Sequence, residues 1–146
     1  MSKLSKLKVA TKTTEVEYPD IEGFRVTLCY LSREELAKIR NRCLKVQYNK
    51  ITRQREETLD AEKFTEEYAR KAIVAWTGLK LKDLHKLLPV DDSALESLDL
   101  EEELEYSSDE AVELLKSSIS FDRFITETMD DLENFAKEQR KTDEKN

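Results

Sequence analysis

Glycine, proline and cysteine are scarce in this sequence of 146 residues, which contains two of each. So few turn-forming residues argue against a sheet-rich protein, and with 39% charged residues they favour a mainly helical chain. Cys29 and Cys43 are too few for a disulfide framework or a zinc site, so we expect free structural thiols. The composition also gives no reason to expect a cofactor.

Long apolar runs are missing as well. No stretch approaches the roughly 20 apolar residues that span a membrane. The first residues, MSKLSKLKVATK, lack the apolar centre of a signal peptide. The sequence therefore predicts a protein that stays where it is made and has no membrane partner.

Catalytic groups are equally sparse. His85 is the only histidine, and its neighbours in sequence include neither a nucleophile nor an orienting group. The acidic run at 101–105 lacks the alternating ligands and central glycine of an EF-hand loop. Phosphate-binding glycine loops, nucleophile elbows and metalloprotease helices do not occur in the sequence. We expect no enzyme and no metal site, and infer that the protein works by binding.

Charge is distributed unevenly along the chain. Residues 1–90 contain 19 Lys+Arg and 13 Asp+Glu, whereas residues 91–146 contain 6 and 19. The plainer interpretation is that acidic residues solvate one half while the two halves attract each other. The alternative is that a basic and an acidic surface meet different partners, with affinities that fall as salt rises.

The first structural signal is extended. Phe24, Val26 and Leu28 alternate with more polar residues, which is the period of a strand with one buried face. A run rich in threonine and valine precedes them, and Pro19 and Gly23 supply turn chemistry between the two. We predict a small N-terminal β-hairpin packed on helices, because two strands alone are marginal in water.

A basic amphipathic helix is expected next. Ser32 followed by Glu35 predicts its start at about Arg33. Its apolar stripe contains Leu36, Ile39, Cys43 and Val46. Its basic face contains Lys38, Arg42, Lys45 and Arg53. Nucleic acid is a candidate partner for such a helix, but flanking glutamates and the lack of a known reader motif make it the weaker candidate.

The longest uncharged run, residues 72–79, surrounds the only tryptophan. We expect a helix that begins after Asp60, carries Trp76 on its apolar face and closes at Gly78. A short leucine helix follows and ends at Pro89. For a single tryptophan at helical spacing, burial in the core is favoured over an exposed groove.

Two acidic helices are expected in the last third. Ser107 and Glu110 predict the start of one, and apolar spacing predicts a long helix from about Ser120 to Gln139. The predicted architecture is mainly α, with the hairpin packed on a bundle of about four to five helices. Residues 15–139 form the single domain, residues 1–14 a basic flexible arm and residues 140–146 a disordered polar tail. The predicted core comprises Phe24, Val26, Leu28, Leu36, Ile39, Phe64, Tyr68, Ile73, Trp76, Leu84, Phe121 and Leu132.

The order of these motifs resembles that of the tail assembly chaperones of long-tailed, siphovirus-type bacteriophages, over roughly residues 15–136. The segments that carry the resemblance are YPDIEGFRVTLCYLSREEL, IVAWTGLKLKDLHKLLPV, the acidic stretch with YSSDEAVELL, and FDRFITETMDDLENF. The resemblance implies a non-catalytic protein of the host cytoplasm that is absent from the mature virion. It would coat the tape measure protein in many self-associating copies and keep it soluble until tail tube subunits assemble around it.

The expected partner contacts come from side-chain chemistry, since the family does not fix its binding residues position by position. They are Lys38, Arg42, Lys45, Phe124 and Met129. Partners would be the tape measure protein, the tail tube protein and further copies of the chain. Two alternatives stay open: a structural component of the tail or head–tail connector, and a nucleic-acid-binding phage regulator.

Overall fold

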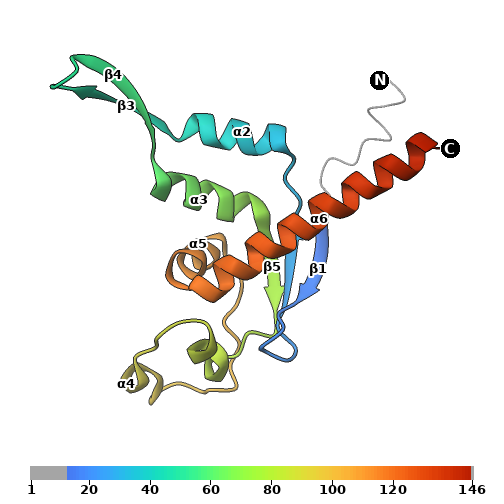
Figure 1. Ribbon diagram of the computed structural model, residues 1–146. Coiled ribbons are helices and arrows are strands. Elements are labelled where there is room, and N and C mark those ends of the chain that lie inside the picture. Colours follow the sequence, from blue (N-terminus) through green and yellow to red (C-terminus); the bar gives the residue numbers. More distant parts are fainter. Residues whose placement is uncertain (1–12, 146) are drawn as a thin grey trace, which may run out of the picture.

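The computed structural model describes the backbone of residues 13–145 and the side chains of residues 13–133, and it shows a mixed α/β fold (Figure 1). Residues 1–12, most of the predicted basic arm, lie outside the described residues, as does Asn146. The elements are β1 (Thr13–Glu17), β2 (Arg25–Cys29), α2 (Arg33–Arg42), β3 (Leu44–Asn49), β4 (Gln54–Leu59), α3 (Ala61–Ala72), β5 (Ile73–Thr77), the 3₁₀ helix η1 (Leu81–Lys86), α4 (Asp92–Leu95), α5 (Ser108–Ser117) and α6 (Ile119–Lys145).

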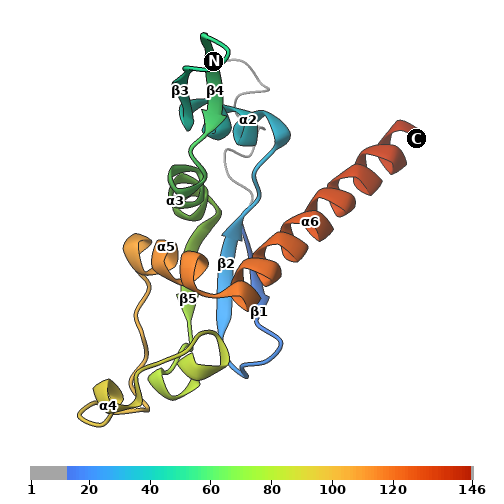
Figure 2. The same ribbon diagram turned by 60° about the vertical axis from the view of Figure 1, so that its left-hand side comes forward.

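A three-stranded antiparallel sheet in the order β1-β2-β5 organises the core. The predicted N-terminal hairpin is present as β1 and β2, and Val26 of the central strand lies opposite Trp76 of β5. The first part of α6 crosses this sheet and α5 lies beside it (Figures 1 and 2). Phe24 and Phe121 are both fully buried, with ring centroids 6.4 Å apart, so sheet and helix share one core.

The prediction of a mainly α protein with one small hairpin is wrong, because five strands within residues 13–145 form two sheets. The second sheet is the hairpin of β3 and β4, which occupies the expected continuation of the basic helix. Helix α2 ends at Cys43, whose backbone N–H bonds to the carbonyls of Arg40 and Asn41. After that point Leu44, Val46 and Tyr48 alternate with polar residues, a period-two signal that the helical spacing of Val46 had obscured.

The segment with the tryptophan is also a strand and not the end of a helix. Helix α3 stops at Ala72, and the chain enters β5 directly at Ile73. β5 supplies hydrogen-bond partners to an edge of β2 that would otherwise be open. Gly78 has a φ of +80° and closes this strand, not a helix.

Three predicted helix starts are confirmed. The side chains of Ser32, Asp60 and Ser107 each accept a hydrogen bond from the backbone N–H three residues later, at 3.2, 3.2 and 3.0 Å. The leucine segment is a 3₁₀ helix, and the backbone of α6 continues to Lys145, beyond the predicted end at Gln139.

The predicted core side chains fall into two groups. Those that are buried are Phe24, Val26, Leu28, Ile39, Ile73, Trp76 and Phe121. Those that are partly buried are Leu36, Phe64, Tyr68, Leu84 and Leu132. A smaller cluster between α2, α3 and the end of β2 includes Ile39 and Ala72, and it adjoins the main core through Tyr68 and Met129.

Candidate partner-binding site

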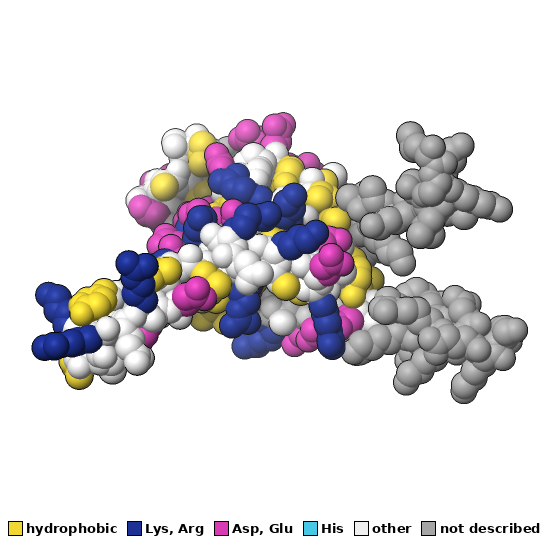
Figure 3. All heavy atoms as spheres, turned by 90° about the horizontal axis from the view of Figure 1, so that it is seen from above, with side chains coloured by type: hydrophobic (Ala, Val, Ile, Leu, Met, Phe, Trp, Pro, Cys, Tyr) yellow, Lys and Arg dark blue, Asp and Glu magenta, His cyan; other side chains and the backbone are white. Residues whose placement is uncertain are grey.

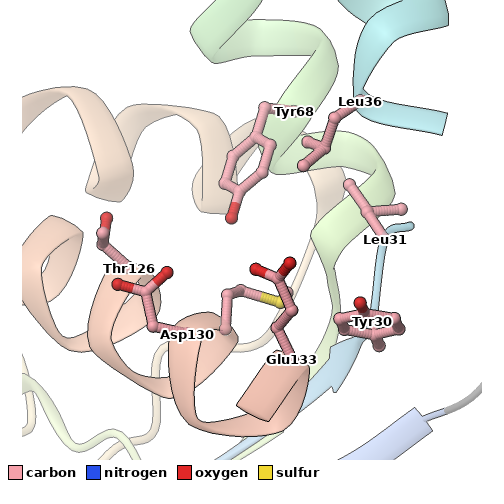
Figure 4. Close-up of a pocket in the computed structure, with 8 residues that line it drawn as sticks. Tyr30, Leu31, Leu36, Tyr68, Thr126, Asp130 and Glu133 are labelled. Carbon is pink, nitrogen blue, oxygen red and sulfur yellow. The ribbon is translucent and has the colours of Figure 1, made fainter. Parts of the chain in front are cut away.

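A cleft of about 120 Å³ lies between α6 on one side and α2, α3 and the end of β2 on the other (Figure 4). Its lining residues are Tyr30, Leu31, Leu36, Tyr68, Thr126, Met129, Asp130 and Glu133. This volume is well below the roughly 300–1,000 Å³ of small-molecule pockets. A single side chain of a protein partner is therefore the better-matched occupant.

The wall of the cleft is apolar. Leu31 is buried, Leu36 is partly buried, and Met129 packs against both hydrophobic clusters. Methionine has an unbranched and polarisable side chain that adapts to differently shaped partners. The cleft is thus suited to an aliphatic or aromatic side chain.

The rim is polar and acidic. In Figure 4 the Tyr68 hydroxyl and the carboxylates of Asp130 and Glu133 point toward the same space. Burial raises the pKa of Tyr68 to about 12, and the Asp122 and Asp130 carboxylates add to the shift, so the phenol stays protonated and can donate a hydrogen bond. Glu133 Oε1 accepts a hydrogen bond of 3.1 Å from Arg33 Nε, which links α6 to the start of α2.

The five predicted partner residues do not form one surface. Lys38 and Arg42 are exposed on α2, and Lys45 is exposed on β3 and not on the predicted helix. Phe124 packs on Tyr18 with ring centroids 4.9 Å apart, so it belongs to the margin of the core. Of the five, Met129 alone lines the cleft.

The other cleft residues were not predicted as partner contacts, although Leu36 and Tyr68 were predicted as core. Asp130 and Glu133 lie on α6 within one turn of Met129, and that spacing was available as a signal. Tyr30 and Leu31 follow β2, and no local pattern connects them with α6. Only the packing of α6 against α2 and α3 brings these segments together.

A second feature is the hairpin of β3 and β4, residues 44–59, which we call the β-arm. It projects from the body of the molecule, and basic and hydrophobic side chains gather at its end (Figures 1 and 3). Val46 and Tyr48 are each 61% exposed, and Ile51 in the turn is 94% exposed. Hairpins with two strands are marginal in water without a covering surface, so the β-arm has the character of a contact element.

The turn of the β-arm is held by Asn49. Its side-chain Oδ1 accepts hydrogen bonds from the backbone N–H groups of Ile51 and Thr52, at 2.9 and 3.2 Å. The Arg53 N–H bonds to the Asn49 carbonyl at 2.8 Å, with Arg53 in the left-handed conformation at a φ of 57°. These bonds define the turn and hold Ile51 out toward solvent.

The cysteines do not provide reactive thiols. Cys29 and Cys43 are both buried and unpaired. Burial raises the pKa of each thiol, and the Cys43 thiol also donates a hydrogen bond of 3.3 Å to Glu67 Oε2. Among the described residues no group of three His, Cys, Asp or Glu side chains could hold a metal ion.

No helix within the described part of the chain has the length and apolar character needed to cross a membrane. Comparisons with protein-family models, with curated proteins and with solved structures found no match.

Proposed function

We propose that the protein is a tail assembly chaperone of a long-tailed bacteriophage. It acts in the host cytoplasm, binds the tape measure protein, keeps it soluble and helps recruit tail tube subunits, and it leaves before the virion is complete. The observation that carries the proposal is the apolar cleft with an acidic rim between α6 and the α2–α3 pair. The order of the sequence motifs supplies the identity of the partner.

The cleft suits an amphipathic helix as its ligand. An apolar side chain of the helix enters between Leu36 and Met129, and basic side chains of the same helix meet Asp130 at the rim. Asp122, exposed on α6 one turn before Thr126, adds a further carboxylate on the same side. This arrangement selects helices that are apolar on one side and basic at its edge, and repels acidic ones.

Co-expression with the tape measure protein encoded by the same phage tests this function. The wild-type chain should raise the soluble fraction of that protein and co-purify with it. The variant Thr126→Arg places a long cation at the exposed margin of the cleft and should abolish both effects. Glu127→Arg is the matched control, because it changes the adjacent exposed residue outside the cleft lining.

The outcomes separate the chaperone from a structural tail component. A chaperone is absent from purified virions, whereas a tail or connector component is present there at stoichiometric copy number. Failure of the wild-type chain to solubilise or to bind the tape measure protein would contradict the proposal. Equal activity of wild type and Thr126→Arg would contradict the role of the cleft in this binding.

A further inference from the structure

One face of the β-arm carries an apolar row that is not covered within the described part of the chain. Register places Leu44 opposite Leu59, Val46 opposite Glu57 and Tyr48 opposite Arg55. Side chains on directly opposed residues share a face, so Leu44, Val46 and Tyr48 form an apolar row along it. Lys45, Lys50, Arg53 and Arg55 make the β-arm basic overall, with Glu56 and Glu57 as its only acidic residues.

A second projection has the complementary character. Residues 91–105, which we call the acidic lobe, contain eight Asp or Glu and no Lys or Arg. Leu98 and Leu100 are 48% and 45% exposed on it. Lys80 and Lys82 bond to Glu101 at 3.0 and 2.9 Å and neutralise part of its charge, but the lobe remains acidic in excess.

The acidic lobe is an ordered surface and not a loose loop. The N–H groups of Leu81 and Lys82 bond to the carbonyls of Glu102 and Leu100, at 2.9 and 3.1 Å. The Leu104 N–H bonds to the Leu79 carbonyl at 2.7 Å. Ordered backbone lowers the entropy lost when a partner binds.

The two projections lie at opposite ends of the molecule in both ribbon views (Figures 1 and 2). We infer that the β-arm of one copy docks on the acidic lobe of a second copy. Because the two surfaces differ, the contact is head-to-tail, and a bound pair still has one free β-arm and one free lobe. Contacts of this kind build open chains unless the rotation happens to close a ring.

Charge complementarity and the exposed side chains select a second copy over other occupants of the β-arm. Nucleic acid would use the basic residues but would leave Val46 and Ile51 without an apolar partner. The lobe carries apolar Leu98 and Leu100 among acidic residues, so it complements both the apolar side chains and the positive charge of the β-arm. A row of linked copies suits a client many times longer than one domain. The biological role of this contact therefore rests on the proposed function, which it deepens.

Sedimentation velocity of the purified chain alone tests the contact, so its result is independent of client binding. Wild-type chain should associate as concentration rises, and association should weaken about tenfold or more at high salt because the charges are exposed. The β-arm variant Val46→Ser/Tyr48→Ser and the lobe variant Leu98→Ser/Leu100→Ser should each be monomeric. An equimolar mixture of the two should form a 1:1 dimer and nothing larger, since one free β-arm meets one free lobe.

Ile119→Ser is the matched control, because Ile119 is 78% exposed and lies on neither projection. It should associate like wild type. All variants change exposed residues, so circular dichroism and thermal unfolding should match wild type and confirm folding. A monomeric wild type at low salt would overturn the inference, as would a mixture that stays monomeric or a lobe variant that associates normally. A wild type that stays monomeric but binds duplex DNA through the β-arm would assign the β-arm to nucleic acid.

Discussion

Trp76 and Leu104 join the sheet to the end of the acidic lobe. The indole Nε1 of Trp76 donates a hydrogen bond of 2.9 Å to the Leu104 carbonyl oxygen. The same ring packs edge-on against Tyr106, with centroids 5.2 Å apart, and Tyr106 donates a hydrogen bond of 2.7 Å to the Ile73 carbonyl. The tryptophan is therefore both a core side chain and an anchor for the lobe.

Replacing Trp76 separates these two roles. Trp76→Phe keeps a ring but leaves the partly buried Leu104 carbonyl without this donor, so it should lower the free energy of unfolding by about 1–3 kcal/mol. Trp76→Ala removes most of the buried side chain and should cost about 3–5 kcal/mol. Urea unfolding followed by circular dichroism measures both. A Phe variant as stable as wild type would show that the hydrogen bond contributes nothing.

Ser118 should be the serine most sensitive to substitution by alanine among those at positions 13–133, whose side chains are described. Its buried hydroxyl donates to the Leu87 carbonyl at 2.6 Å and accepts from the Phe121 N–H at 3.0 Å, so it links the segment after η1 to the start of α6. Ser118→Ala should cost about 1–3 kcal/mol. The control is the neighbouring Ser117, which is exposed and whose hydroxyl donates a hydrogen bond to Glu113. The stability of Ser117→Ala should be within about 0.5 kcal/mol of wild type.

The two glycines should differ in their tolerance of alanine. Both have positive φ, at +84° for Gly23 and +80° for Gly78. A Cβ on Gly78 would meet the backbone carbonyl of Gly23, whereas a Cβ on Gly23 would have open space around it. Gly23→Ala should cost about 1 kcal/mol from backbone strain, and Gly78→Ala should cost clearly more, because backbone must also move. Equal thermal stabilities of the two variants would contradict this packing.

The raised pKa of Tyr68 predicts a late step in alkaline titration. Ultraviolet titration of wild type should contain one tyrosine that ionises near pH 12, and Tyr68→Phe should remove that step. Since the folded pKa lies above the usual value of 10, the fold favours the neutral phenol. This contribution to stability is complete below about pH 10 and is lost as pH rises toward 12. A Tyr68 that titrates near pH 10 would show that the cleft is open to water.

Local patterns predicted the helix caps, the N-terminal hairpin and an apolar environment for Trp76. These patterns gave the wrong element where the apolar residues of a segment fit both a helical period and the period of two of a strand. Val46 continues the helical spacing of Ile39 and Cys43, yet it also alternates with Tyr48, and the stop of α2 at Cys43 decides between the two. Ile73 to Trp76 likewise fits a helix, and pairing with β2 makes it a strand.

The cleft could be anticipated only in part. Met129 was predicted as a partner contact from its side-chain chemistry, and it lines the cleft. Leu31 and Tyr68 come from other segments, and their approach to α6 depends on tertiary packing that no local spacing encodes.

Binding of purified chain to overlapping helical segments of the tape measure protein tests the central claim most directly. Calorimetry should detect at least one segment that binds wild type and Glu127→Arg with similar affinity. The same segment should bind Thr126→Arg at least about tenfold more weakly, because the added side chain obstructs the cleft. Absence of binding to every segment, or equal affinity for wild type and Thr126→Arg, would contradict the account.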